Sequence, residues 1–208
     1  GWYHEIAKLS REDAMTFYKH YYAPNNSILV VSGDVEADEV KTLAEATYGK
    51  IPANPAVKST RVRPQDPPQL APRRLELKDA RAGNFSFHRD YVTPSYTTAK
   101  PGEAEALDLM MKIAASGSTS RLYKKLVVEE GVASSAGGDF SGSGLDTGTL
   151  SIYAVANDGV PLAKVEESVD AVLADVAKNG VTEKELERAK NSYIADYIYE
   201  SDNQATLA

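Results

Sequence analysis

Hydrophobic and polar positions in the first fifty residues follow helical spacing on either side of one short apolar run. Between Ser10, a favourable helix N-cap, and Pro24, which ends the segment, apolar residues recur on one face. Residues 28–31 are apolar without alternation, which predicts a short strand buried on both faces. Helical spacing returns over residues 36–48. The front of the chain is therefore predicted to be helix, strand and helix.

The pattern changes to a period of two after residue 72. Alternation predicts strands in RRLELKD, residues 73–79, and in NFSFHRDYV, residues 84–92. Because ARAG between them is a candidate turn, we expect these two strands to form an antiparallel hairpin. Residues 131–140 and 148–156 are two further strand candidates, and the glycine and serine residues between them indicate a wide or mobile turn.

Four helices are predicted in this second portion. Residues 102–116 are apolar enough for a deeply buried helix, and a shorter helix is expected over 118–130. Residues 161–178 carry an apolar stripe, and a last helix begins at Thr182, where TEKE forms a capping box. Its inward face is expected to carry Leu186, Ala189, Tyr193 and Tyr197. The order of strands and helices predicts an α+β fold of two layers, with helices covering one face of a mostly antiparallel sheet.

A proline-rich segment divides the chain. Residues 51–72 hold six of the ten prolines and show no period in their apolar positions, which indicates an extended, fairly stiff linker. The resulting division is a front portion, residues 1–50, and a larger second portion, residues 73–208.

Composition excludes several classes of function. The 208 residues include 42% hydrophobic residues, enough for a real core, and the net charge of −7 offers no basic footprint for nucleic acid. No apolar run is long enough to span a membrane, and the first residues lack the pattern of a signal peptide. The absence of cysteine excludes disulfides and thiolate metal sites, and leaves the bacterial periplasm and the cytoplasm both open as compartments.

The histidines do not form a recognisable metal or catalytic motif. His4 and His20 are sixteen residues apart, and neither belongs to a pattern that directs two imidazoles from one helical face to a metal. His88 is interpreted as an ordinary solvated or hydrogen-bonded histidine, on the strand face opposite Phe85 and Phe87. We therefore predict no metal site and no catalytic residue on this chain.

Two further candidate motifs have simpler structural interpretations. The glycine-rich segment GGDFSGSGLDTG, residues 137–148, lacks the glycine spacing and the lysine of a phosphate-binding loop, so a flexible hairpin tip is predicted. Ser134 and Ser135 have no histidine nearby in sequence and no G-x-S-x-G turn, which leaves a nucleophilic role unsupported.

Acidic and aromatic clusters are also assigned to ordinary structure. The pairs Glu129–Glu130 and Glu183–Glu185 are interpreted as solvated helix residues. Tyrosines of the last helix are candidates for a peptide-binding surface, although a helix packed on a partner layer is the favoured interpretation: Tyr193, Tyr197 and Tyr199.

Three segments together resemble one family of enzymes. They are LSREDAMTFYKHYYAPNNSILVVSGDVEADEV, SGSTSRLYKKLVVEEGVASSA and VTEKELERAKNSYIADYIY, in this order along nearly the whole chain. These segments resemble the pitrilysin/insulinase-like (M16) zinc metallopeptidases, in particular bacterial members built from two gene products or paired subunits. The resemblance implies that residues 1–50 close a first M16 domain and that residues 73–208 form most of a second, non-zinc domain, truncated at its C-terminus.

The resemblance also implies which functional residues this chain lacks. The family holds zinc through an H-x-x-E-H helix and a later glutamate in the first domain, and neither is found here. An arginine and a tyrosine of the second domain complete the active site in some members, and their positions are occupied here by Val127 and Ser134. The resemblance therefore implies zinc in the parent protein but none on this chain.

Three hypotheses of function follow. The first is the non-catalytic domain of a zinc-dependent endopeptidase, which encloses peptide substrates with a missing N-terminal catalytic domain and pairs with a second M16 subunit as a homodimer or heterodimer. The second is a structural or assembly subunit of the type found in the core of respiratory complex III. The third is a stand-alone peptide-binding module. Because the first-domain remnant lacks its sheet neighbours, the isolated chain is expected to self-associate.

Overall fold

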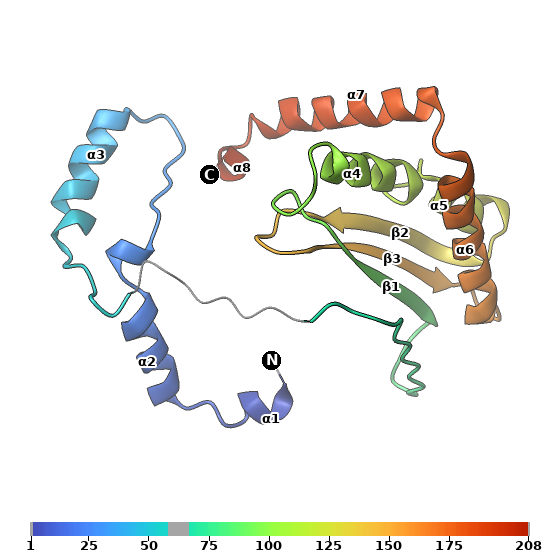
Figure 1. Cartoon of the computed structure of the whole chain (residues 1–208), viewed down its shortest axis with the longest axis horizontal. Helices are drawn as coiled ribbons and strands as arrows, with labels where there is room; N and C mark the ends of the chain where they lie inside the picture. Colours follow the sequence, from blue (N-terminus) through green and yellow to red (C-terminus); the bar gives the residue numbers. More distant parts are fainter. Residues whose placement is uncertain (1, 58–66, 208) are drawn as a thin grey trace. The chain divides into compact units, whose positions relative to one another are not determined.

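The structure is a computed structural model that describes residues 2–57 and 67–207 (Figure 1). The chain forms two compact units. One contains the residues up to Arg73 together with those from Ile198 onward, and the other contains Arg74–Tyr197. Residues 58–66 of the predicted linker lie outside the described residues. The division of the sequence into residues 1–50, 51–72 and 73–208 stays a prediction.

A three-stranded antiparallel sheet organises the second unit. Its strands are β1 (Ser86–Thr93), β2 (Ala133–Ser141) and β3 (Gly148–Ala156), in the order β1-β3-β2. Phe87 lies opposite Ala154 in the first pair of strands, and Ala136 lies opposite Ala154 in the second. The strands predicted over residues 84–92, 131–140 and 148–156 are therefore confirmed.

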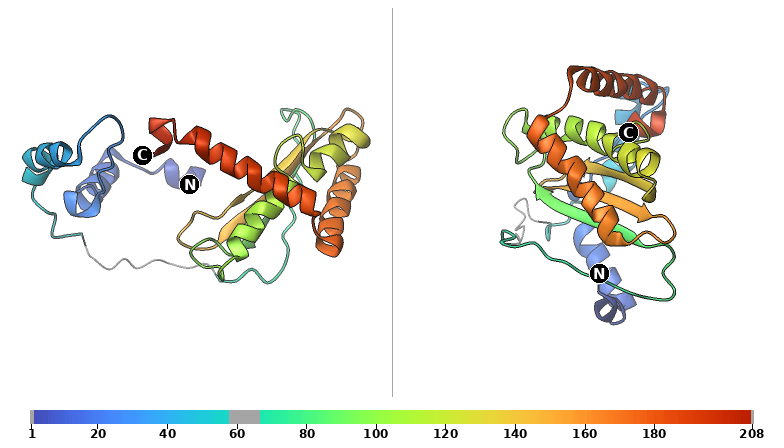
Figure 2. Two further views of the ribbon diagram at one scale, coloured as in Figure 1. Left: turned by 90° about the horizontal axis from the view of Figure 1, so that it is seen from above. Right: turned by 90° about the vertical axis from the view of Figure 1, so that its right-hand side faces the viewer.

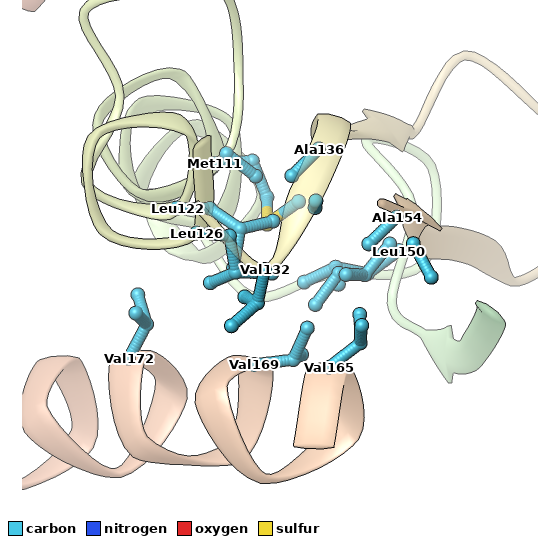
Figure 3. Close-up of a cluster of buried hydrophobic side chains, with 14 residues drawn as sticks. Met111, Leu122, Leu126, Val132, Ala136, Leu150, Ala154, Val165, Val169 and Val172 are labelled. Carbon is cyan, nitrogen blue, oxygen red and sulfur yellow. The ribbon is translucent and has the colours of Figure 1, made fainter. Parts of the chain in front are cut away.

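Helices form the second layer and cover one face of the sheet (Figures 1 and 2). They are α4 (Glu103–Ala114), the short α5 (Arg121–Tyr123), the π-helical turn η3 (Lys124–Glu129) and α6 (Leu162–Asn179). The stripe predicted on α6 points toward the strands, with Val165 and Val169 fully buried (Figure 3). The predicted fold class, a two-layer α+β arrangement with an antiparallel sheet, is confirmed.

The hydrophobic core lies between these two layers. Leu122 and Leu126 from α5 and η3, Met111 from α4 and Ile152 from β3 have at most 1% of their surface exposed. Figure 3 shows these helices approaching the same cluster as α6 from another side. Small residues on the strands, such as Ala154, allow the helices to approach the sheet closely.

Gly138 of β2 has no room for a side chain between β3 and α4. A Cβ atom at this position would lie 2.4 Å from the carbonyl oxygen of Ser151 and 2.9 Å from Cε of Met111. We expect Gly138→Ala to lower the free energy of unfolding by about 1–2 kcal/mol, because strand and helix must move apart. Urea unfolding followed by circular dichroism measures this change. Gly83→Ala is the matched control, because nothing lies within 4 Å of a Cβ atom there; equal losses in the two variants would contradict the explanation.

Helix α7 (Glu183–Glu200) begins as predicted but buries less than predicted. Oγ1 of Thr182 accepts a hydrogen bond from the amide of Glu185, whose carboxylate accepts one from the amide of Thr182, so the capping box is confirmed. Ala189 is buried, but 75% of Tyr197 is exposed. The prediction that Tyr197 faces inward is therefore wrong: α7 is bonded to α4 through Tyr193 and Asp196, and Tyr197 is not on the side of the helix that makes these contacts.

The hairpin predicted between residues 73–79 and 84–92 is wrong. β1 pairs with β3 instead, and Leu75 and Leu77 are 93% and 83% exposed. Two leucines among charged neighbours bury little apolar area, and the guanidinium of Arg74 is bound to Glu166 of α6 at 2.8 Å. The segment therefore contacts the helix through this exposed ion pair, and residues 73–79 pair with no strand in the structure.

The first unit consists of short helices. They are α1 (Tyr3–Ile6), α2 (Arg11–Tyr21), η1 (Pro24–Asn26), α3 (Ala37–Ala46), η2 (Tyr48–Lys50) and α8 (Gln204–Leu207). The predicted N-cap is confirmed, since Oγ of Ser10 accepts a hydrogen bond from the amide of Asp13.

The buried strand predicted over residues 28–31 is not formed. Ile28 is 91% exposed, Val31 is 47% exposed, and no strand is assigned to this segment. An apolar run forms a buried strand only when neighbouring strands pair with it and a layer covers it. The described part of this chain supplies neither.

Candidate functional site

Val127 lies in the π-helical turn η3, where the hydrogen bonds skip one residue more than in an α-helix. The amide of Glu130 donates to the carbonyl of Lys125, five residues earlier, at 3.0 Å. Just after the turn, the amide of Val132 donates to the carbonyl of Leu126 at 2.9 Å. Val127 is half-buried and packs against the hydrophobic core, whereas Val128 is 68% exposed. The isopropyl group of Val127 contributes to packing, and it has no charge with which to polarise the carbonyl group of a substrate.

Ser134 lies at a register shift at the start of β2. The pairing steps from Ala133 to Ser135, so Ser134 has no direct partner on β3. Its Oγ donates to the carbonyl of Val155 at 3.3 Å, and the side chain is exposed. In the part of the chain that the structure describes, the side chain of Ser134 is bonded to a backbone carbonyl and makes no hydrogen bond to an imidazole.

The three histidines lie apart from one another. His4 and His20 are exposed residues of α1 and α2 in the first unit, and His20 packs edge-on against Tyr21. His88 lies on β1 in the second unit, where its ring stacks 6.4 Å from that of Tyr153. Among residues 2–57 and 67–207, no group of three or more histidine, aspartate or glutamate side chains is placed to hold a metal ion. These donors do not fit a zinc site.

The sheet face opposite the helices is polar and accessible. We call it the open face, and its residues are Ser86, His88, Asp90, Val92, Ser135, Gly137, Asp139, Ser141, Thr149, Ser151, Tyr153 and Val155. Asp90 accepts a hydrogen bond from Oγ of Ser151 at 2.7 Å. The ring of Tyr153 lies over Gly137, where a Cβ atom would approach its hydroxyl to 2.8 Å. This arrangement forms a shallow wall of small polar residues around one aromatic ring.

One residue of each acidic pair, Glu185 and Glu130, is bound to a neighbouring element and is not simply solvated, which corrects the sequence interpretation for these two residues. Glu185 accepts a bidentate pair of hydrogen bonds from Arg121 at 2.7 and 2.8 Å, and Arg121 also binds Asp175 at 2.9 Å. These hydrogen bonds hold the pKa of Glu185 far below its ordinary value. Glu130 accepts a hydrogen bond from Ser168 at 2.5 Å, which also lowers its pKa.

A second charged cluster joins β1 to α6. The guanidinium of Arg89 binds Glu166 at 2.8 Å and also pairs with Asp170. The hydrogen bond to Asp170 is the main cause of the raised pKa of Arg89, and Tyr91 adds to it. Because its pairing partners come from a distant helix, sequence spacing gives no signal for this cluster.

One carboxylate connects three elements of the second unit. Asp108 of α4 accepts hydrogen bonds from the hydroxyls of Tyr193 at 2.6 Å and Tyr96 at 2.8 Å. Burial and the neighbouring Asp108 raise the pKa of Tyr96 to about 12 and that of Tyr193 further. The favoured interpretation of the tyrosines is thus confirmed for Tyr193, whereas Tyr199 is 77% exposed.

The glycine-rich segment forms the connection of the β2–β3 hairpin. The carbonyl of Gly142 accepts a hydrogen bond from the amide of Tyr96, and the carbonyl of Gly144 accepts one from Oγ1 of Thr97. The glycine-rich segment therefore turns backbone carbonyls toward the neighbouring loop, whereas a phosphate-binding loop would present backbone amides. The hairpin predicted here is confirmed.

Comparisons with known proteins point to one family. Residues 8–193 match the family model described as the peptidase M16 inactive domain. The chain is 24% identical, over its full length and 46% of the relative, to the zinc protease PqqE of Helicobacter pylori. It is 27% identical, over 92% of its length and 42% of the relative, to an uncharacterized zinc protease of Mycobacterium leprae. The chain thus spans less than half the length of these curated relatives.

Solved structures show the same fold. A protease from Helicobacter pylori superimposes with a TM-score of 0.91 at 23% identity, over all of this chain and 49% of that one. A putative M16-like peptidase from Alicyclobacillus acidocaldarius superimposes with a TM-score of 0.73 at 20% identity, over all of this chain and 48% of that one. In the described segments of our chain, no helix has the length and apolar character needed to cross a membrane.

Proposed function

Because this chain belongs to the peptidase M16 family, as its inactive domain, we propose that it is the non-catalytic part of a zinc-dependent endopeptidase. In this proposal it forms part of the chamber that encloses peptide substrates and part of the interface between subunits. In this proposal zinc is held by a separate N-terminal M16 domain, since residues 2–57 and 67–207 of this chain contain no group of donors placed to hold a metal ion.

The apolar surface of the first unit is the observation that carries the proposal. One face of α2 forms an open groove lined by Leu9, Ser10, Asp13, Ala14, Phe17, Tyr18 and Tyr22. The extended run from Ile28 to Val31 is also about half exposed or more. An apolar surface of this extent is typical of a protein interface. A zinc-bearing domain that pairs with residues 28–31 and covers α2 would complete the first unit.

Val127 and Ser134 support the subunit part of the proposal. Neither side chain can polarise a peptide carbonyl or stabilise an oxyanion, as an arginine and a tyrosine can. We propose that a second M16 subunit supplies that pair to the active site. In this arrangement the open face of the sheet acts as a wall of the chamber and not as a catalytic surface.

The proposal predicts that this chain is inactive alone and active when assembled. The isolated 208-residue chain is expected to bind no stoichiometric zinc and to leave a fluorogenic peptide intact, because it supplies neither metal ligands nor an oxyanion donor. Co-expression with the zinc-bearing domain of the same gene is expected to yield a complex, and addition of a second M16 subunit to yield hydrolysis that a chelator abolishes. Elemental analysis and peptide cleavage measure these outcomes. One tightly held zinc per isolated chain, with chelator-sensitive cleavage, would refute the proposal.

A further inference from the structure

Two contacts join helix α7 to helix α4 in the second unit (Figure 1). The hydroxyl of Tyr193 donates a hydrogen bond to Oδ1 of Asp108 at 2.6 Å. One turn further along α4, the ammonium group of Lys112 pairs with Asp196 at 3.0 Å and lies 4.9 Å from the centre of the Tyr193 ring. The ring of Tyr193 is therefore held at two points, by Asp108 at its hydroxyl and by Lys112 over its face.

A separate set of contacts ties the loop after β1 to residues 142–147 between β2 and β3, which we call the hairpin tip. The amide of Tyr96 donates to the carbonyl of Gly142 at 3.0 Å, and Oγ1 of Thr97 donates to the carbonyl of Gly144 at 2.9 Å. The ring of Tyr96 lies 6.1 Å from that of Phe140, and a Cβ atom on Gly142 would lie 3.1 Å from the Tyr96 ring. The loop and the hairpin tip therefore hold each other in place through Tyr96 and Thr97.

Asp108 connects these two sets of contacts, because its two carboxylate oxygens serve different residues. Oδ1 accepts the hydrogen bond from Tyr193, and Oδ2 accepts one from the hydroxyl of Tyr96 at 2.8 Å. Hydrogen bonds to an ionised acceptor are stronger than those between neutral groups, and a carboxylate that is bonded through both oxygens has a fixed orientation. If Tyr193 withdraws, Asp108 is free to turn toward water, and Tyr96 then loses an acceptor that is held in position.

We propose that Asp108 is a positioning residue that couples the attachment of α7 to the order of the hairpin tip. While α7 is bound to α4, both oxygens of Asp108 are occupied, and Tyr96 holds the hairpin tip against the loop after β1. When α7 moves away, the hairpin tip is released, and its glycines allow it to change conformation. The coupling involves only residues of the second unit, so it goes beyond the proposed function and does not depend on assembly with a zinc-bearing domain.

Amide hydrogen exchange followed by NMR tests the coupling, with the amide of Tyr96 as the probe because it is bonded to Gly142. The amide of Ala156, bonded to Phe85 at the opposite end of β1, reports the stability of the sheet as a whole. Tyr193→Phe removes one hydroxyl from α7 and leaves the loop and the hairpin tip unchanged in sequence. It is nevertheless expected to raise the exchange rate of the Tyr96 amide, relative to that of Ala156, at least about threefold.

Tyr197→Phe is the matched control for this experiment. Tyr197 is a tyrosine of the same helix, one turn beyond Tyr193, and its side chain is 75% exposed. The loss of its hydroxyl is expected to leave the ratio of the two exchange rates unchanged. An unchanged ratio in Tyr193→Phe, or an equal rise of the ratio in both variants, would overturn the proposal.

A double-mutant cycle provides a second test that does not depend on amide exchange. Tyr96→Phe and Tyr193→Phe each remove one donor to Asp108, and each is expected to raise the equilibrium constant of unfolding, measured in urea. Because the two donors share one carboxylate, the effect of the double variant is expected to be smaller than the product of the single effects, by at least about threefold. Tyr96→Phe combined with Tyr197→Phe is the control, and its two effects are expected to multiply. A double effect equal to the product, or larger, for Tyr96 and Tyr193 would refute the coupling.

Discussion

Leu126→Ala is expected to lower the free energy of unfolding by about 3 kcal/mol. Leu126 has no exposed surface and lies where η3 meets both β2 and α6 in the hydrophobic cluster. The backbone of Leu126 is also held in place, since its carbonyl accepts a hydrogen bond from the amide of Val132. The surrounding side chains therefore cannot collapse into the space that the leucine leaves. Urea unfolding followed by circular dichroism at 222 nm measures the loss.

Val128→Ala is the matched control for this prediction. Val128 belongs to the same turn but is 68% exposed, so its truncation is expected to change stability by less than about 0.5 kcal/mol. A comparable loss in both variants would show that alanine disturbs the π-helical turn itself, and that the buried contacts of Leu126 are not the cause.

Arg121→Ala is expected to lower the free energy of unfolding by about 2 kcal/mol, because it leaves two carboxylates without their partner. The side chains of Arg121 and Glu185 are each about one-fifth exposed, and Asp175 lies at the third guanidinium nitrogen. Arg81→Ala is the control, since Arg81 pairs with Asp79 at 2.6 Å but is 90% exposed. No measurable loss is expected there. Equal losses of stability in Arg121→Ala and Arg81→Ala would show that burial does not determine how much an ion pair contributes.

The same ion pair predicts how stability depends on pH. The folded protein holds the pKa of Glu185 below its ordinary value, chiefly through the hydrogen bonds from Arg121. A lowered pKa stabilises the folded state above the ordinary pKa of glutamate, about 4.3, and this stabilisation is lost as the pH falls below it. The difference in stability between the parent chain and Glu185→Gln should therefore shrink between about pH 5 and pH 3. A difference that stays constant over this range would exclude the linkage.

The local sequence was sufficient to predict the elements whose hydrogen bonds and apolar faces are set by residues close together in the chain. The stripe on α6, the N-cap at Ser10, the capping box at Thr182 and the alternation of β3 each depend on residues a few positions apart. Binary patterning and capping chemistry specify such elements before any tertiary contact forms. The α+β fold class follows from their order along the chain, and the structure confirms it.

The errors have a common physical cause. The runs at residues 28–31 and 75–77 both have the composition of strands, yet both are exposed and unpaired in the structure. A strand satisfies its backbone only through a neighbour, so strand propensity does not determine whether that neighbour is present. The prediction for Tyr197 failed for a similar reason, because an apolar stripe on a helix is buried only where another element covers it.

The sequence by itself determined the helices, the strands of the central sheet, the lack of a zinc-binding motif and the resemblance to M16 peptidases. Only the tertiary structure revealed that Arg121 binds Glu185 and that Arg89 joins β1 to α6. The physical reason is the separation along the chain. Capping and periodicity act within one or two turns of a helix. These ion pairs join residues 60 to 80 positions apart, and only the packing of the layers brings such residues together.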